Sequence, residues 1–347
     1  MQADVLIRGA GPVGCALALA LRGSALRVVL LDPHPTPKAL HPIALSHGSR
    51  LILERLGVWA ALETTAIEHI LVTQSGAFGR TRLDARDAGV PALGYVTDYA
   101  ALVAALRAPL AAQFVTQESD ARCVVHAEGS ALDAVEKPYG QSALVALVRT
   151  RPEAAATAFE RFTADGPLAL LPCAGRYALI WTAPPERSAE LAAMDEERFL
   201  AELAQAAGSA PGAPVAVEQR SVRPLARRVR AARIAPRAVY IGNAAQTLHP
   251  VAGQGLNLGL RDAWQLAREL AQAPDPGDAA VLARYAARRR LDTSATIGVT
   301  HWLATGFAGS NRALRAARGL ALTALDVLPG PRRFFARRMM YGPSAAP

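Results

Sequence analysis

The chain has 347 residues, of which 51% are hydrophobic, 19% charged and 5% aromatic, and its formal net charge is +9. The length suits one large α/β domain or two interleaved ones, and the composition excludes disordered and collagen-like chains. Because no nucleic-acid-binding motif accompanies the positive charge, we expect no nucleic-acid partner and favour an anionic lipid surface.

The N-terminal residues follow the order of a dinucleotide-binding fingerprint. Residues 4–7 predict a buried strand, which leads into the turn Gly9-Ala10-Gly11-Pro12-Val13-Gly14 and then into a helical run. A second strand at 28–31 ends at Asp32. Strand, glycine turn, helix, strand and acid together predict an adenine dinucleotide site, although the motif does not choose between FAD and NAD.

Each glycine of this turn has its own physical reason. Gly9 permits the tight turn, Gly11 lets a pyrophosphate approach the backbone, and Gly14 allows the helix to pack closely on the strand. The helix N-terminus presents amide groups and partial positive charge to the phosphates. The carboxylate of Asp32 lies where it can accept hydrogen bonds from ribose hydroxyls. The alternative interpretation is a glycine turn that only connects two elements.

The middle of the chain predicts a sheet with helical connections. Strands are expected at 142–149 and 176–181. A helical segment at 194–207 follows them, and the chain returns to the sheet at Val222. Upstream, only about a dozen residues separate a helix at 99–110 from a strand at 123–126.

A second glycine-rich run follows the strand predicted at 238–241. It reads Gly242-Asn243-Ala244-Ala245-Gln246-Thr247-Leu248-His249-Pro250-Val251-Ala252-Gly253-Gln254-Gly255-Leu256-Asn257 and continues into a helix that ends near Leu270. Its proline and glycines predict a backbone pressed close to another group. A glycine-lined helix N-terminus suits the stabilisation of negative charge that develops on a flat ligand.

Cysteine spacing and hydropathy indicate the compartment. The three cysteines form no CxxC pair, so we predict neither disulfides nor a metal site. No targeting signal is recognisable, and the uncharged run at 293–311 carries too many polar residues and glycines for a membrane helix. We expect a soluble, cytoplasmic protein, with peripheral contact at the inner face of the membrane as an option.

At this point the sequence resembles a known family. Residues 4–14, 44–50, 139–145, 159–163, 240–262 and 284–343 are similar to the FAD-dependent aromatic hydroxylases of ubiquinone biosynthesis, of the UbiH type, within the class A flavoprotein monooxygenases. The resemblance implies an α/β fold in which a Rossmann-like, GR2-type FAD-binding domain is interleaved with a β-sheet substrate domain. The implied bounds are 1–138 and 226–283 for the FAD-binding domain, 139–225 for the substrate domain and 284–347 for C-terminal helices.

The resemblance also implies a reaction. NAD(P)H reduces FAD, the reduced flavin and O₂ form a C4a-hydroperoxide, and a lipid-soluble polyprenyl phenol is hydroxylated on its ring. Two alternatives stay open. One is a flavin hydroxylase of a small soluble aromatic compound, and the other is a catalytically silent family member that serves as a subunit of a biosynthetic complex.

The residues carried over from the family are of two kinds. Pro250, His249 and Gln254 are expected in the flavin environment of the catalytic site, with no protein nucleophile. The residues expected to bind FAD are Gly9, Gly11, Gly14, Asp32, Arg50, Gly242, Asn243, Gly253, Gly255, Leu256 and Asn257. Simpler interpretations are a positional role for His249, helix capping by Gln254 and Asn257, and a helix-surface pair of Arg261 with Asp262.

Two of the departures from the family bear most directly on FAD binding. Glu128-Gly129 stands where the family has an aspartate before glycine, and the segment 110–122 is shortened, which puts FAD retention in question.

Arginines also recur among apolar residues at 284–343. They predict either solvated faces of packed helices or a basic amphipathic face for a membrane or partner enzymes.

Overall fold

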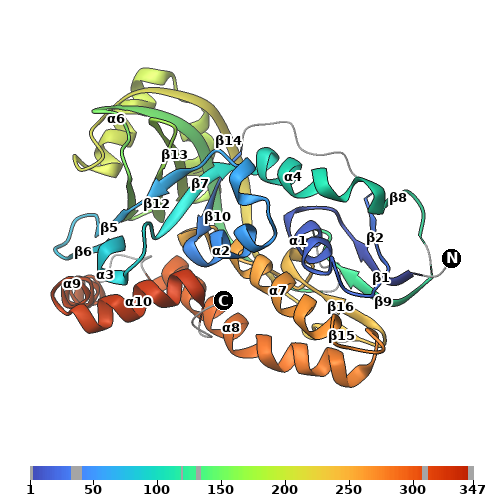
Figure 1. Ribbon diagram of the computed structural model, residues 1–347. Coiled ribbons are helices and arrows are strands. Elements are labelled where there is room, and N and C mark those ends of the chain that lie inside the picture. The colour runs from blue at the N-terminus through green and yellow to red at the C-terminus, as the bar shows by residue number, and fades with distance from the viewer. Residues whose placement is uncertain (1–2, 33–40, 119, 130–133, 307–311, 343–347) are drawn as a thin grey trace.

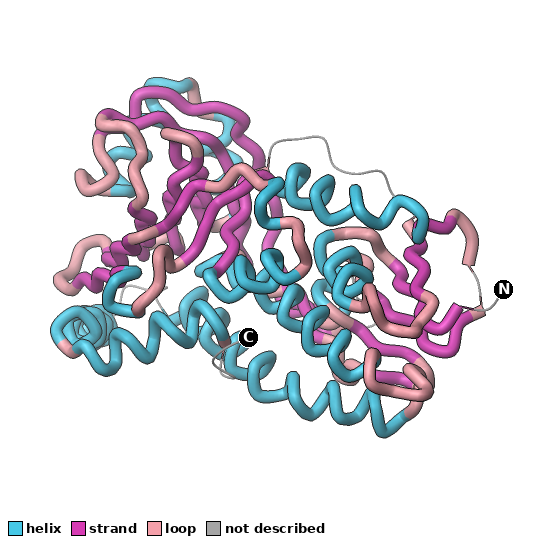
Figure 2. The backbone as a smooth tube through the Cα atoms, viewed as in Figure 1, coloured by secondary structure: helices cyan, strands magenta, loops and turns pink. Residues whose placement is uncertain are grey.

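Two groups of strands, with helices between them, form the body of the protein (Figure 2). The computed structural model describes residues 3–32, 41–118, 120–129, 134–306 and 312–342. Figure 1 shows the N-terminal strands in one group and the strands of the middle of the chain in the other, with C-terminal helices running beneath both. The predicted mixed α/β fold with helices at the C-terminus is confirmed.

The first group is a six-stranded sheet built around the N-terminal strand. Its order is β15 (Ile234–Ala235), β16 (Ala238–Tyr240), β9 (Ala121–His126), β1 (Ala3–Arg8), β2 (Val28–Leu31) and β8 (Phe114–Val115). All pairs are parallel except β15 with β16. The shortened segment therefore supplies the edge strand β8, after the 3₁₀ helix η2 (Ala108–Gln113).

Helices cover one face of this sheet because alternate strand residues are apolar. Val5 and Ile7 of β1 and Leu30 of β2 are fully buried with residues of the helices that pack there. These helices are α1 (Pro12–Ala20), α2 (His47–Arg55), α4 (Tyr99–Arg107), α7 (Gln254–Leu270) and α8 (Ala279–Gly306). The sequence thus forms the predicted strand, turn, helix and strand at 3–31.

The second group is an eight-stranded sheet. Its order is β17 (Gln246–Thr247), β14 (Ala213–Val229), β10 (Val135–Arg151), β13 (Arg176–Ala183), β12 (Pro167–Cys173), β11 (Thr157–Phe162), β5 (His69–Gln74) and β6 (Arg80–Asp84). On one face, α5 (Pro185–Ala193) and α6 (Glu196–Ala207) pack over an apolar cluster that includes Trp181 and Phe199.

This sheet is larger than the segment 139–225 expected for the substrate domain. Strands β10 and β14 extend beyond both bounds, and residues 69–84 add β5 and β6 at one edge. A small third sheet contains β3 (Pro42–Ser46), β7 (Gly94–Asp98) and β4 (Thr65–Ile67), and β5 and β6 of the large sheet lie between β4 and β7 in the chain. The division into domains stays a prediction.

The C-terminal helices connect the two regions. Helix α8 packs on α7, whereas α9 (Arg312–Val327) packs on β6, and α10 (Pro329–Tyr341) contacts α2 and the short helix α3 (Ala85–Ala88). Figure 1 shows these helices along one side of the molecule. None of the helices in the described ranges has the length and apolar character needed to cross a bilayer.

Candidate flavin site

The N-terminal glycine turn contains two positions that the chain itself restricts to glycine. Gly9 has a φ of +101°, and a Cβ there would lie 2.7 Å from the Glu128 amide nitrogen. A Cβ on Gly14 would lie 2.0 Å from the Gly9 carbonyl oxygen. Gly11 is different, because its nearest neighbour would be the Tyr99 hydroxyl at 3.7 Å. The turn is therefore closed by Gly9 and Gly14 and leaves room beside Gly11.

The first turn of α1 lacks a side-chain cap although it is buried. Gly11 is the N-cap residue and makes no side-chain hydrogen bond, while Pro12 and Gly14 are buried. Helix α4 shows the usual arrangement, since the Asp98 carboxylate accepts a hydrogen bond from the Ala101 amide at 3.0 Å. A buried helix start without a cap is suited to an anion that accepts hydrogen bonds from the amide groups.

Asp32 lies beside this turn at the end of β2. The Gly9 amide donates to the Leu31 carbonyl at 2.9 Å, which fixes the turn next to that strand end. The Asp32 carboxylate forms an ion pair with Arg107 at 2.6 Å. The ion pair orients the carboxylate at the position that the fingerprint predicts for ribose binding.

The second glycine-rich run forms a similar uncapped helix start. Gly242 and Gly253 both have a φ of +58°, and Gly253 is the N-cap residue of α7 without a side-chain cap. Asn243 is exposed between the buried Gly242 and Ala244. A Cβ on Gly255 would meet no described atom within 4 Å. The start of α7 therefore also leaves space beside its first turn.

Asn257 joins this helix start to the segment 44–49. Its Oδ1 accepts hydrogen bonds from the Ser46 amide at 2.8 Å and from the Ser49 hydroxyl at 2.7 Å, while its Nδ2 donates to the Ala44 carbonyl at 3.1 Å. A Cβ on Gly259, two residues further along α7, would lie 2.7 Å from the Val13 side chain of α1. Three motifs far apart in sequence thus meet, but Asn257 acts as a connection rather than as a helix cap.

His249 and Pro250 stand directly before this helix start. Burial lowers the pKa of His249 to about 4, so the imidazole is neutral near pH 7. Its Nδ1 accepts a hydrogen bond from the Val251 amide at 3.1 Å, and the Tyr139 ring contacts it edge-on at 4.9 Å. Pro250 is half-buried and begins the 3₁₀ helix η4 (Val251–Gly253). This geometry favours the positional role for His249.

Arg50 and Gln254 make contacts within the protein. Arg50 donates to Glu54 at 2.7 Å and to the Tyr95 hydroxyl at 2.8 Å. The buried Gln254 side chain lies 3.4 Å from the Met339 carbonyl oxygen of α10. These contacts support structural roles, and the flavin-related roles of both residues stay predictions. The backbone of Leu256 lies in the first turn of α7, and its contact with FAD stays a prediction.

The sequence interpretation of Arg261 and Asp262 as a helix-surface pair is wrong. Asp262 is fully buried, and it accepts hydrogen bonds from Arg289 at 2.8 Å and from Gln246 at 2.9 Å. Burial alone would raise the pKa of Asp262, but Arg233 and Arg289 outweigh that effect and hold the pKa below its usual value. The Gly242 amide also donates to Asp262 at 3.3 Å, so this carboxylate supports the turn at 242.

Arg261 and Arg289 form a second buried pair with Asp292 of α8. The Arg261 Nε lies 2.8 Å from Asp292 Oδ2, and Arg289 also pairs with this carboxylate. Arg289 and Arg318 are each at most 5% exposed. The arginines at 284–343 are therefore not all solvated, because buried acids of α7 and α8 neutralise part of them.

Glu160 of β11 is a buried titratable residue that the sequence interpretation missed. Its strand neighbour Phe162 packs against Val251 and Leu322, whereas Phe159 packs with the cluster under α5 and α6. Alternation along the strand therefore directs Glu160 to the same face as Phe162, toward η4. Its Oε1 is buried without a hydrogen-bond partner in the described structure, and burial raises its pKa to about 8. Only the strand alternation could have predicted this orientation.

The residues present fit FAD. Two uncapped helix starts, at Gly11 and Gly253, follow or contain positions that the fold restricts to glycine. The backbone has open space beside it at Gly11 and at Gly255. The turns lie on helices that pack on each other, so one extended dinucleotide could contact both. The arrangement is that of an α/β flavoprotein, in which the backbone supplies the cofactor contacts and no protein nucleophile is required.

Comparison with known proteins supports the same class. Residues 133–298 match the family described as FAD binding domain. The chain is 31% identical to ubiquinone hydroxylase UbiL of Rhodospirillum rubrum, covering 97% of this chain and 89% of that protein. It is 29% identical to 3-demethoxyubiquinol 3-hydroxylase of Escherichia coli, covering 93% and 94%.

A solved structure confirms the fold. Klebsiella pneumoniae HpxO complexed with FAD and uric acid superposes with a TM-score of 0.76 at 18% identity, covering 99% of this chain and 98% of that chain. The chain belongs to the family of FAD-dependent monooxygenases that includes ubiquinone hydroxylase UbiL. FAD is its cofactor, and NAD(P)H is the co-substrate typical of the family.

Proposed function

We propose that the protein hydroxylates the aromatic ring of a polyprenyl phenol on the route to ubiquinone, with NAD(P)H and O₂ as co-substrates. The observation that carries this proposal is the pairing of a flavin-type glycine site with an apolar sheet face. Phe162 of β11 belongs to the same buried apolar cluster as Val251, which follows Pro250 in the glycine-rich run. An apolar surface beside the flavin position suits a hydrocarbon-rich phenol better than a charged aromatic acid.

The chain's own residues divide the work of binding and orientation. The amide groups at the starts of α1 and α7 are placed to hold anionic parts of the cofactor, which supplies the redox and oxygen chemistry when bound. The neutral His249 fixes the Val251 amide, and so the path of the loop after Pro250. Glu160 is protonated near pH 7 and offers a hydroxyl donor on the apolar face, where it could orient a phenol oxygen.

A lipid-soluble substrate requires access from a membrane, and the surface near the C-terminus supports such contact. Leu320, Val327 and Leu328 of α9 and its end, with Phe334 of α10 and Phe78 of the β5–β6 turn, are between 49% and 69% exposed. Arg333 and Arg337 are exposed beside them. Apolar side chains next to arginines are typical of surfaces that bind anionic bilayers, so we include peripheral membrane contact in the proposal.

The first experiment is the visible spectrum of the purified protein, before and after incubation with FAD. We expect an oxidised-flavin spectrum that bleaches with NADH or NADPH and returns in air. A detergent-solubilised long-tail phenol should accelerate bleaching and yield a product one oxygen heavier. The matched control is the same phenol without its tail.

The possible outcomes separate the three functions. Equal acceleration by the tail-less phenol would favour the hydroxylase of a small soluble aromatic. A flavin that bleaches but never oxygenates either phenol would contradict both hydroxylase functions. A colourless protein that takes up no FAD would favour the catalytically silent subunit. The basis of that alternative is the shortened segment 110–122, which contains the two-residue strand β8, together with the variant motif Glu128-Gly129.

A further inference from the structure

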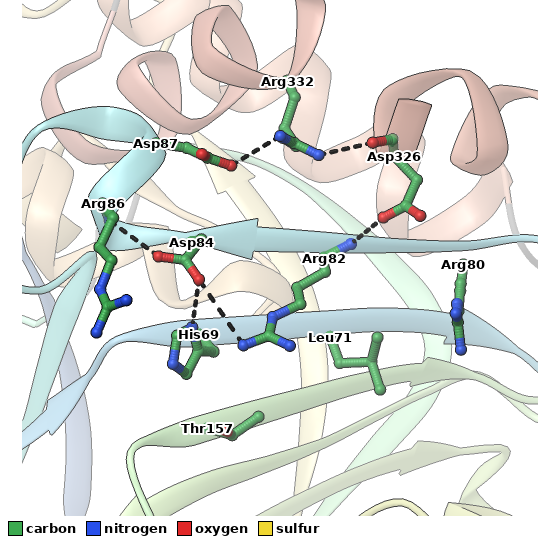
Figure 3. A pocket seen from close by; sticks show the side chains of 10 residues that line it. All are labelled: His69, Leu71, Arg80, Arg82, Asp84, Arg86, Asp87, Thr157, Asp326 and Arg332. Atoms are coloured by element: carbon green, nitrogen blue, oxygen red, sulfur yellow. Dashed lines mark hydrogen bonds and ion pairs between the residues drawn. The ribbon is translucent and has the colours of Figure 1, made fainter. Parts of the chain in front are cut away.

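A pocket of about 540 Å³ opens at the edge of the eight-stranded sheet that lies farthest from β17. Residues of β5, β6, β11, α3, α9 and α10 line it (Figure 3). None of these elements carries the glycine turns of the flavin site. In Figure 1, β6 and α9 lie at one end of the molecule and β1 and α1 near the other. The pocket is therefore separate from the flavin position.

Strand alternation directs two arginines of β6 into this pocket. Thr81 and Leu83 are buried, and the Thr81 hydroxyl donates to the Leu322 carbonyl of α9. Arg80 and Arg82 therefore extend from the opposite face of the strand. Figure 3 shows their side chains, with that of Arg86 from α3, on the side of β6 that faces Leu71 and Thr157. Three guanidinium groups thus share one face of the pocket.

The carboxylates that line the pocket are mostly engaged elsewhere. Asp87 pairs with Arg332 at 2.8 Å, and Asp326 accepts a hydrogen bond from the Arg82 backbone amide at 2.8 Å. Figure 3 shows Asp87, Asp326 and Arg332 on the other side of β6 from the three guanidinium groups.

On the side of the three guanidinium groups, only one carboxylate remains. Asp84 lies 2.9 Å from His69 and 3.7 Å from the Arg82 guanidinium. Over the whole described lining, four arginines against three aspartates leave one net positive charge, and the Arg80 and Arg86 guanidinium groups have no hydrogen-bond or ion-pair partner among the described residues.

We propose that this pocket binds a phosphate group, carried either by a soluble phosphate ester or by a phospholipid headgroup. A phosphate group is anionic near neutral pH, and the unpaired guanidinium groups of Arg80 and Arg86 can neutralise it. Guanidinium groups bind phosphate oxygens in bidentate geometry, and Arg80, Arg82 and Arg86 come from two elements that can contact different oxygens. The volume exceeds that of one phosphate, and Leu71 provides an apolar wall for the attached group.

The test uses the FAD-loaded protein, so that the flavin position is occupied and does not compete for the probe. Phenyl phosphate is titrated by calorimetry at constant ionic strength. Co-sedimentation is measured in parallel with phosphatidylcholine vesicles that contain or lack phosphatidate. The variant is Arg80→Gln with Arg86→Gln, because both side chains are exposed and their loss should leave the fold intact. The matched control is Arg149→Gln, an exposed arginine on β10, which four strands separate from β6.

Two results would support the site and would identify the source of the phosphate. Saturable binding of phenyl phosphate that weakens at least about tenfold in the double variant, and not in the control, indicates a soluble ligand. Phosphatidate-dependent sedimentation with the same pattern, without phenyl phosphate binding, indicates a headgroup. The proposal is overturned if neither probe binds, or if the double variant binds as tightly as the control. These outcomes do not depend on hydroxylase activity, so this inference can fail while the proposed function holds.

Discussion

The flavin site and the basic pocket at β6 are built in opposite ways. The proposed flavin site offers backbone amides at two helix starts, and glycines such as Gly9 and Gly14 shape it. The basic pocket uses long charged side chains on a strand, a short helix and the ends of two helices. A backbone site requires a fixed local order of residues, whereas a side-chain pocket requires only that the fold bring arginines together.

The largest expected effect on stability concerns the buried network of Asp262, Arg233 and Arg289, which supports the turn at Gly242 beside the proposed flavin site. Asp262→Asn leaves Arg233 and Arg289 buried without their shared carboxylate, so we expect a loss of about 3–5 kcal/mol in the free energy of unfolding. Urea denaturation of the FAD-loaded protein measures it. Asp275→Asn, which removes a partly exposed partner of Arg237, should cost at most about 1 kcal/mol. Equal effects of the two substitutions would show that the buried network does not stabilise the flavin region.

A smaller effect concerns Glu160, on the strand that contributes Thr157 to the basic pocket. The unfolded chain releases this proton near pH 4.5, whereas the folded protein holds it until about pH 8. The stability that the proton contributes is therefore lost as the pH rises through this range. Glu160→Gln has no proton to lose. Its free energy of unfolding, relative to that of the wild type, should therefore rise between pH 5 and pH 8 by on the order of 2 kcal/mol.

Parallel pH profiles for the two proteins would contradict the burial of this carboxyl. Glu153→Gln serves as the control, because Glu153 is exposed in the loop before β11 and should change the profile little. Thermal unfolding across the pH range supplies both comparisons.

The smallest effect tests the backbone site directly. Gly255→Ala meets no described atom and should stabilise the cofactor-free helix by about 0.5–1 kcal/mol, since alanine favours helices over glycine. If FAD lies against the first turn of α7, the added methyl should weaken FAD binding about tenfold, the equivalent of 1.4 kcal/mol. Fluorescence titration with FAD measures this, and Gly298→Ala, also open and on α8, should bind FAD normally. Unchanged affinity in Gly255→Ala would place the cofactor elsewhere.

The difference between the two regions explains what the sequence could predict. The elements at 3–31 and 238–270 follow from local patterns, because strand, glycine turn and helix are contiguous there. The basic pocket joins residues 69–87 with 326–332, and no local pattern states that these segments meet. The same holds for Asp262, whose partner Arg289 lies on the next helix, in an arginine-rich stretch that predicts either solvated helix faces or a basic amphipathic surface. Strand β11 is intermediate, because its alternation predicts the two faces but not what covers them.

The two buried helix starts without caps have a consequence for the lifetime of the protein in the cell. Without FAD, the first turns of α1 and α7 lack both a side-chain cap and a ligand, so the cofactor-free form should open locally at these turns. Ligand binding stabilises the folded state in proportion to the logarithm of free FAD, and locally opened chains are substrates for proteases. Riboflavin supply would then set the amount of this protein through degradation, before it limits the catalytic rate.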